Sequence, residues 1–395
     1  MIGTSGTAAP ARLEAIDVLR GLVIVLMVVD HAREYSAGTG RVTDPMTLDA
    51  TGPLLYWMRW ASHLCAPVFT LLAGASVGLQ GGATGRAARM RYLVTRGLVL
   101  VVLEFTVVHF AWTFSTVWPM RYAQVIWGLG LSLIVLGLLH WVPARVRWAL
   151  GAAIVAGHNL LDGWHVTWPP ALHWAWAILH DRQVMPLWGE LSVRTSYPVL
   201  PMIGLVLVGE ALGHWYRATP DANRRRRVLL GIGAVAILAF VVLRVTNVYG
   251  DPTPSDLSGA WTRDVLSMLN ATKYPMSLAF VLMTLGPACL LLAAWDRGVP
   301  RGARWLRRFG TVPMFVYIAH LYLLHALAIV WALALGFPWS AFDFRARITG
   351  LPASFGFPLW VTLPFVAVTL ALLWWPAGWY ARLRASRRYA FTRYI

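Results

Sequence analysis

The chain has 395 residues, of which 58% are hydrophobic and only 13% are charged. Soluble domains carry about twice that charged fraction, so the composition excludes an ordinary soluble protein and favours a membrane protein. The net charge of +17 comes almost entirely from Arg, because Lys273 is the single lysine. The arginines stand in short clusters between apolar runs, which indicates membrane topology and argues against a nucleic-acid partner.

Ten apolar segments follow one another and predict an all-α, polytopic transmembrane helix bundle. Their approximate limits are 16–34, 54–79, 92–115, 122–142, 146–161, 197–216, 228–246, 273–295, 311–336 and 357–381. The fifth is short, because a hydrocarbon core of about 30 Å takes roughly 20 helical residues. We therefore predict a cytoplasmic segment over residues 1–15, one transmembrane domain over 16–381, and a basic cytoplasmic tail over 382–395.

The distribution of charge predicts the orientation of the bundle. With a cytoplasmic N terminus, 22 of the 34 basic residues fall on the cytoplasmic side, nine on the outer side and three inside segments. The outer loops are longer and hold ten of the 17 acidic residues. Because cytoplasmic loops are enriched in Lys and Arg, both termini are predicted to be cytoplasmic.

Ionisable side chains inside the apolar segments are the first candidates for a site, because they are costly in a bilayer and normally face the bundle interior. They are Asp17, Arg20, Asp30 and His31 in the first segment, Arg59 and His63 in the second, Glu104 and His109 in the third, Glu210 in the sixth, Arg244 in the seventh, and His320 and His325 in the ninth. A helical rise of about 1.5 Å per residue places His31, His63, His109 and His325 at a similar depth in the outer third of the membrane.

Helical periodicity predicts which groups share a face. In the first segment, 3–4 spacing joins Asp17, Arg20, Ile24, Met27 and His31, whereas Asp30 points about 100° away. In the second segment, it joins Arg59, His63, Pro67, Thr70 and Gly74, and Gly74–Gly78 is a small-xxx-small pair that allows close helix approach. His320 and His325 are about 140° apart, so only one of them need face a shared site.

Structural roles stand beside these functional ones. Asp17 and Arg20 can form a structural pair, Asp30 can pair with Arg33, and the histidines and Glu104 can make interhelical hydrogen bonds. The outer segment 162–196 is rich in Trp and His and is predicted to be an interfacial lid or re-entrant piece. No His, Cys or Asp spacing there is specific to a metal, so no metal is expected. Cys65 and Cys289 lie in apolar stretches and predict no disulfide.

Four stretches of the chain carry recognisable motifs. They read RLEAIDVLRGLVIVLMVVDHARE (residues 12–34), RWASHLCAPVFTLLAGASVGL (59–79), KYPMSLAFVLMTLGP (273–287) and LRRFGTVPMFVYIAHLYLLH (306–325). The D-x-L-R-G motif at 17–21 and A-P-x-F-x-x-L-A-G at 66–74 are the most specific. Together these stretches resemble the catalytic-domain family of heparan-α-glucosaminide N-acetyltransferase, and in particular its bacterial branch.

The resemblance implies transfer of an acyl group from cytoplasmic acyl-coenzyme A to a sugar or glycan acceptor at the outer side. An acetyl group, from acetyl-coenzyme A, is the first expectation. The histidine implicated in the lysosomal enzymes lies in the segment leading into the second span, where residues 49–58 contain no His. The nearest replacements are His31 and His63, which we predict as candidates for the catalytic base. Asp30 would orient the base.

Other groups have predicted roles in the same reaction. Residues predicted to bind the anionic cofactor are Asp17, Arg20, Arg86 and Arg89, within a basic cytoplasmic rim that extends to Arg96. Candidates that could contact the substrate or stabilise an oxyanion are Arg59, Glu104, His109, Tyr317, His320 and His325.

Two rival classes fit the same polar layer. A proton-coupled transporter or exporter also places His, Glu and Arg inside the membrane, although no matched pair of broken helices is evident. A non-catalytic assembly or signalling protein would need only the hydrogen bonds. The expected partners are membrane lipids and a glycan or other small acceptor, a homodimer is left open, and the expected location is the bacterial cytoplasmic membrane.

Overall fold

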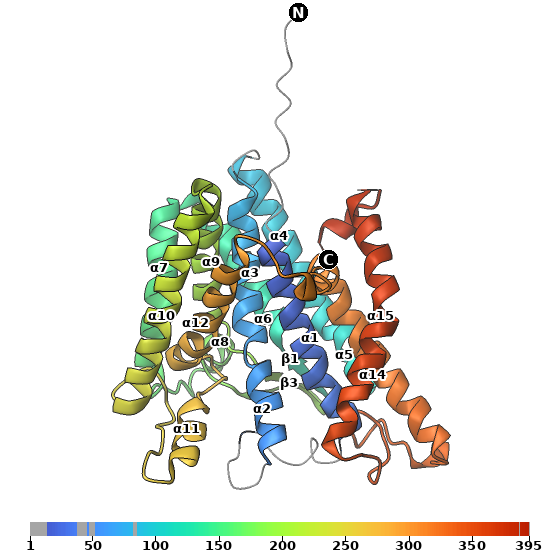
Figure 1. The fold of residues 1–395 in the computed structure, drawn as a ribbon. Helices are drawn as coiled ribbons and strands as arrows, with labels where there is room; N and C mark the ends of the chain where they lie inside the picture. The colour runs from blue at the N-terminus through green and yellow to red at the C-terminus, as the bar shows by residue number, and fades with distance from the viewer. Residues whose placement is uncertain (1–13, 38–45, 47–51, 82–84, 387, 395) are drawn as a thin grey trace, which may run out of the picture.

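The computed structural model describes residues 14–37, 46, 52–81, 85–386 and 388–394, so the predicted segment at residues 1–13 lies outside the described residues. Figure 1 shows a bundle of roughly parallel and antiparallel helices. All ten predicted segments contain helix. The helices are α1 (Glu14–Ser36), α2 (Pro53–Ser62), α3 (Cys65–Leu79), α4 (Arg86–Leu103), α5 (His109–Thr113), α6 (Val125–Leu138), α7 (Ala144–Gly157), α9 (Leu200–Ala218), α10 (Ala222–Thr246), α12 (Leu278–Trp295), α14 (Pro313–Ala334) and α15 (Thr362–Ala385).

Among the residues that the structure describes, six helical stretches are both long enough and apolar enough to cross a bilayer. They are Pro53–Leu79, Arg86–Thr113, Ala222–Thr246, Leu278–Trp295, Pro313–Ala334 and Leu359–Ala385. The fourth and fifth predicted segments form helices of only 14 residues each, α6 and α7. An integral membrane protein is thereby supported, whereas the count of ten spans and the side on which the termini lie remain predictions.

Local sequence explains where several helices begin or break. The second segment divides at His63 and Leu64, because Pro67 has no N–H to donate to the carbonyl of His63. A π-helical turn, Glu104–Val108, joins α4 to α5. The predicted segment 273–295 becomes helical only at Leu278, where the hydroxyl of Ser277 caps the helix by accepting from the N–H of Phe280 at 3.0 Å.

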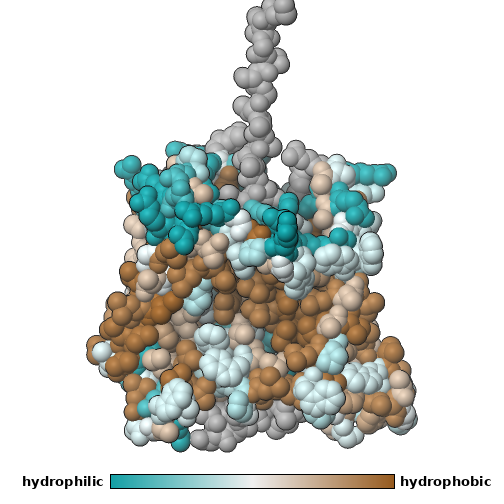
Figure 2. All heavy atoms as spheres, viewed as in Figure 1, coloured by the Kyte–Doolittle hydropathy of each residue, from teal (hydrophilic) through white to brown (hydrophobic). Residues whose placement is uncertain are grey.

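The surface of the bundle is divided into bands. Figure 2 shows hydrophilic side chains at one end and a hydrophobic band below them. We call this hydrophilic end, where α3 ends at Leu79 and α4 begins at Arg86, the basic face. At the opposite end, exposed tryptophans are Trp164, Trp168, Trp188 and Trp261. Tryptophan at the border of an apolar band is typical of a membrane interface.

The outer segment is more ordered than its sequence indicated. It forms helix α8 (Pro170–Leu179) and a hairpin of β2 (Val184–Trp188) and β3 (Leu191–Thr195). Strand β1 (Met120–Ala123) pairs in parallel with β3, which gives the sheet order β1-β3-β2. A second short helix, α11 (Trp261–Leu269), lies at the same end of the bundle (Figure 1). These strands of four or five residues were not predicted.

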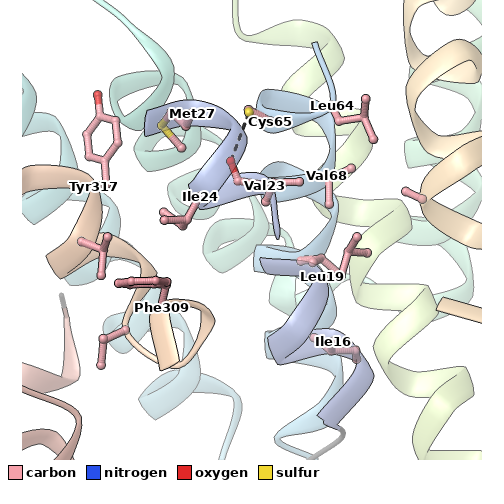
Figure 3. Packing of buried hydrophobic residues seen from close by; sticks show 14 of the residues in the cluster. Ile16, Leu19, Val23, Ile24, Met27, Leu64, Cys65, Val68, Phe309 and Tyr317 are labelled. Atoms are coloured by element: carbon pink, nitrogen blue, oxygen red, sulfur yellow. Dashed lines mark hydrogen bonds between the residues drawn. The ribbon is translucent and has the colours of Figure 1, made fainter. Parts of the chain in front are cut away.

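Helix α1 lies at the centre, in contact with α2, α3, α12, α14, α15 and the short helix α13 (Leu306–Gly310). Its apolar residues pack against Leu64, Val68 and Phe309, as Figure 3 shows, and the thiol of Cys65 donates to the carbonyl of Val23 at 3.2 Å. Both cysteines are buried and free, as expected.

The predicted Gly74–Gly78 pair does permit close helix approach. A Cβ at Gly74 would lie 2.1 Å from the carbonyl oxygen of Val206, and one at Gly78 would lie 2.3 Å from that of Glu210. Helix α9 contributes Gly209 to the same contact, where a Cβ would lie 2.0 Å from the carbonyl oxygen of Leu71. Helices α3 and α9 therefore touch through their backbones.

Candidate active site

One cavity of about 820 Å³ extends beside α1 between a cluster of arginines and the side chain of His31. Its walls come from α1, α3, α4, α6, α9 and α14 together with the turn before α12. Its charged lining residues are Asp17, Arg20, Asp30, His31, Arg96, Arg217, Arg225, Lys273 and Arg384. Between its two ends the wall is largely apolar, with Met27, Phe69 and Leu129 among the lining residues.

The polar stripe predicted on the first segment faces this cavity. Asp17, Arg20, Met27 and His31 all line it, whereas Ile24 packs into the apolar core. Asp30 also lines the cavity, although its helical angle differs from that of the stripe. The 3.6-residue period therefore identified one wall of the site.

Arg20 forms the predicted pair with Asp17 and also ties α1 to α3. Its Nη1 lies 3.0 Å from Oδ1 of Asp17, and its Nη2 donates to the hydroxyl of Ser76 at 2.5 Å and to the carbonyl of Leu72 at 3.2 Å. The pair is therefore both a structural element and part of the cavity wall. The structural role and the cofactor-binding role that were both considered for Asp17 and Arg20 are therefore compatible.

The arginine end of the cavity agrees with the prediction only in part, because Asp17, Arg20 and Arg96 line it but two predicted arginines do not. Arg86 is exposed at the first position of α4, and Arg89 is buried, and neither lines the cavity. Arg96 does line it, about 10 Å further along α4 than Arg89. The Nε of Arg96 is buried and has no hydrogen-bond partner among the described residues.

The other arginines at this end are held in place by neighbours. Arg217 donates to the carbonyl of Gly78 at 3.2 Å, and Arg384 donates to that of Thr311 at 3.1 Å. Arg225 pairs with Asp296 at 2.9 Å. These three residues come from the ends of α9 and α15 and the start of α10. Nothing in the sequence indicates that these three helix ends meet.

At the other end, His31 meets His320 of α14. Nδ1 of His31 lies 2.7 Å from Nε2 of His320, with the rings stacked at a centroid distance of 5.0 Å. Nδ1 of His320 lies 2.9 Å from the carbonyl oxygen of Val316, to which only a protonated nitrogen can donate. In neutral rings, Nε2 of His320 then accepts from Nδ1–H of His31. This assignment leaves the lone pair on Nε2 of His31.

Asp30 does not have the predicted orienting role towards His31. Its Oδ2 accepts from Arg59 at 2.5 Å, and its Oδ1 accepts from Arg33 at 3.4 Å. The carboxylate is thus engaged by two guanidinium groups, one of which comes from α2. His320 makes the hydrogen bond to His31 that was expected from Asp30.

His63 and Glu104 lie outside the lining of the cavity. His63 is 2% exposed and packs against Phe280 at a ring distance of 5.1 Å. The residues of α3 that line the cavity include Ala66, Phe69 and Ala73, none of which belongs to the 3–4 stripe predicted through His63. Glu104 accepts from the N–H of Trp127 at 3.1 Å and so satisfies the first turn of α6.

His109 and His325 have structural partners. Nε2 of His109 contacts Arg121, and the nitrogens of His325 lie 2.9 Å from the carbonyl oxygen of Ala111 and 2.8 Å from that of Thr349. Neither residue lines the cavity. Of the two histidines on α14, the one that approaches the cavity is His320.

Three further residues line the cavity, and only one of them was predicted from the sequence. Tyr317 was predicted, and its ring lies 6.5 Å from that of His31. Lys273 and Tyr197 were missed. A signal was available for Lys273, because it is the single lysine and opens one of the motif stretches. Tyr197 precedes α9 and offered no such signal.

Comparison with known proteins agrees with two of the four motif stretches, residues 12–34 and 59–79, which lie inside the matched region. The family model described as Heparan-alpha-glucosaminide N-acetyltransferase, catalytic, matches residues 12–245. The match covers more than half of the 395 residues and includes the Asp17–Arg20 pair and His31. A search of curated proteins found no match. With its bundle of apolar helices and this match, the chain belongs to the family of the heparan-α-glucosaminide N-acetyltransferase catalytic domain, a family of membrane acetyltransferases.

Proposed function

We propose that this chain takes acetyl-coenzyme A from the cytoplasm at its basic face and transfers the acetyl group to a hydroxyl or amine of a sugar or glycan acceptor on the other side. The observation that carries this proposal is one continuous cavity lined by both an arginine cluster and His31. The membrane would be the bacterial cytoplasmic membrane.

The arginine end suits the phosphates of coenzyme A. Arg96, Arg217, Arg225 and Arg384 line it, and guanidinium groups bind phosphate through charge-assisted hydrogen bonds. Arg20 and His31 are separated by about 16 Å along α1, because a helix rises about 1.5 Å per residue. An extended pantetheine arm, roughly 15–20 Å long, matches this separation.

His31 is the base in this proposal. The acceptor gives its proton to Nε2 of His31 while its oxygen or nitrogen forms a bond to the carbonyl carbon of the thioester. The carbon–sulfur bond then breaks, and the proton passes to the departing thiolate of coenzyme A. A transient acetyl group on Nε2 would use the same lone pair, so both routes place the same demand on His31.

The remaining lining groups supply positive charge and hydrogen bonds at the reacting end. The ammonium group of Lys273 and the hydroxyl groups of Tyr197 and Tyr317 line the same cavity as His31. Donors of this kind stabilise the negative charge that develops on the carbonyl oxygen. Lys273 is our first choice for this role, because a lysine side chain offers several hydrogen-bond donors on one nitrogen.

The test is acetyl transfer in proteoliposomes loaded with candidate amino sugars and glycans, with radiolabelled acetyl-coenzyme A outside. The wild-type protein should label an internal acceptor, and His31→Ala should lower the rate by about 10²–10⁴-fold. His63→Asn is the matched control, because it changes a buried histidine that does not line the cavity, and it should retain most activity.

Three outcomes would contradict the proposal. Equal activity in wild type and His31→Ala would remove the base, and loss in His63→Asn alone would move the site to the other predicted histidine. Accumulation of an unmodified solute, with no acetyl transfer to any acceptor, would favour a transporter.

A further inference from the structure

A second polar cluster lies at the end of the bundle opposite the basic face. His158 follows α7, Asp162 comes in the next turn, and His180 follows α8. One potential ligand atom from each residue lies within 4.8 Å of the other two. His158 and His180 are each 2% exposed, whereas Asp162 is partly exposed.

The side chain of His158 is the main indication that this cluster takes a ligand. Neither of its ring nitrogens has a hydrogen-bond partner among the described residues, although the backbone of Met276 lies nearby. Oδ1 of Asp162 is also buried without a partner of good geometry. Burying such groups unpaired is unfavourable, so each typically binds a protein group, a water molecule or an ion.

One pair of ligand atoms already has the separation that a small divalent metal ion requires, and all three lie within 4.8 Å of one another. Nε2 of His180 lies 3.5 Å from Oδ1 of Asp162. A tetrahedral zinc ion with bonds of about 2.0–2.2 Å requires ligand atoms about 3.3–3.6 Å apart. The same nitrogen lies 3.1 Å from the carbonyl oxygen of His158, so metal binding would replace that hydrogen bond.

The surroundings of the cluster already fix two of the three ligands. Asn159 donates to Oδ2 of Asp162 at 2.7 Å, and its own Oδ1 accepts from the N–H of Leu278 at 2.8 Å. The ring of Trp176 stacks on His180 at a centroid distance of 5.3 Å. Outer contacts of this kind orient metal ligands and increase affinity.

We propose that His158, Asp162 and His180 bind a zinc ion on the outer side of the membrane. Two imidazoles and a carboxylate are ligands that Zn²⁺ favours, and a water molecule would complete the tetrahedron. The ion joins the end of α7 to the end of α8 and fixes the segment that leads into the three-stranded sheet. This proposal does not rest on acetyl transfer.

The separation of the three ligands along the chain explains why no metal-binding motif is visible in the sequence. His158 and Asp162 are close in sequence, but His180 belongs to another element. His165 and His173, which stand between them in the chain, point to other partners. His165 contacts Asp181 at 3.1 Å, and His173 contacts the carbonyl oxygen of Val166 at 2.6 Å.

The test is direct measurement of zinc on the full chain, purified in detergent with a tag that contains no histidine. After incubation with Zn²⁺ and removal of the free ion, the wild type should retain about one equivalent. Asp162→Asn and His180→Ala should each retain less than about a tenth of an equivalent. His165→Ala, a change of an exposed histidine in the same segment, should retain the ion.

A second readout keeps the proposal testable if a variant folds poorly. Saturating Zn²⁺ should raise the thermal midpoint of the wild type and of His165→Ala by about 2–5 °C, as expected for a ligand that binds only the folded state. Asp162→Asn, which preserves side-chain volume, should show no such rise. A wild-type protein that retains no zinc, or one whose retention falls equally in His165→Ala and His180→Ala, would overturn the assignment.

Discussion

Nδ1 of His31 lies 2.7 Å from Nε2 of His320, and the two residues are 289 positions apart in the chain. The family match at residues 12–245 contains His31 but ends before His320. The histidine pair therefore depends on the packing of α14 against α1, which brings a helix outside the matched region to the candidate base. His320 is fully buried and holds its own orientation through the carbonyl of Val316.

Replacing His320 should impair the position of His31 without removing a group that contacts substrate. His320→Phe removes the acceptor for Nδ1–H of His31, and we expect kcat to fall by about 10–100-fold with little change in KM for acetyl-coenzyme A. His320→Gln keeps an amide oxygen that can accept the bond and should recover part of the loss. Steady-state kinetics of both variants, with the pH profile of kcat, provide the measurement.

A general loss of structure would look different. It would lower the amount of folded protein in both variants and leave the pH profile of the remaining activity unchanged. If His320→Gln were as slow as His320→Phe, with both folded, the hydrogen bond would have no positioning role.

Two arginines of the same helix should differ in their effect on the donor. Arg96 lines the cavity and has a buried Nε without a partner among the described residues, whereas Arg86 is exposed at the start of α4. A hydrogen bond to a charged group contributes about 1.5–3 kcal/mol, so Arg96→Gln should raise KM for acetyl-coenzyme A by about tenfold or more. Arg86→Gln should leave it within about twofold. Initial rates over a range of donor concentrations would reveal the difference, and equal KM values would place the phosphates elsewhere.

Sequence reasoning succeeded where one helix determines the answer. The stripe of Asp17, Arg20, Met27 and His31 follows from helical periodicity, and all four line the cavity. The close approach at Gly74 and Gly78 likewise follows from local spacing, because only the absence of a side chain is required.

Sequence reasoning failed where the site depends on which helices pack against one another. The partner of His31 was predicted to be Asp30, one residue away, but tertiary packing supplies His320 and gives Asp30 to Arg59. The arginine cluster failed for the same reason, because Arg217, Arg225 and Arg384 meet only after the ends of three helices are packed together. Periodicity cannot report which helices are neighbours.

The buried pair of Asp30 and Arg59 should be costly to break on one side. Their side chains are 11% and 17% exposed, and Nη1 of Arg59 lies 2.5 Å from Oδ2 of Asp30. Asp30→Asn preserves shape but leaves the guanidinium group of Arg59 without its carboxylate, so the free energy of unfolding should fall by about 3 kcal/mol. The change can be measured by unfolding in mixed detergent micelles.

Two comparisons test the cause of that loss. Adding Arg59→Met to Asp30→Asn should recover part of the stability, because the unpaired charge is gone. Glu14→Gln breaks a more exposed pair, in which Arg307 lies 3.8 Å away and the side chains are 36% and 50% exposed, and it should cost less than about 0.5 kcal/mol because water screens it. A similar loss in Asp30→Asn and Glu14→Gln would contradict a special role for the buried pair.

The D-x-L-R-G motif ends in a glycine whose missing side chain lets α1 touch α13. A Cβ at Gly21 would lie 1.9 Å from the carbonyl oxygen of Leu306, and a Cβ at Gly310 would lie 1.7 Å from that of Asp17. Because backbone cannot move aside as a flexible side chain can, Gly21→Ala and Gly310→Ala should each lower the free energy of unfolding by about 3 kcal/mol. They should also lower activity, since both changes displace the segment that carries Asp17 and Arg20.

Gly231→Ala on α10 is the matched control, because a Cβ there meets nothing within 4 Å, and it should be neutral or stabilising by up to about 1 kcal/mol. Unfolding of the three variants side by side would decide the matter, and equal stability would mean that α1 and α13 are not in backbone contact.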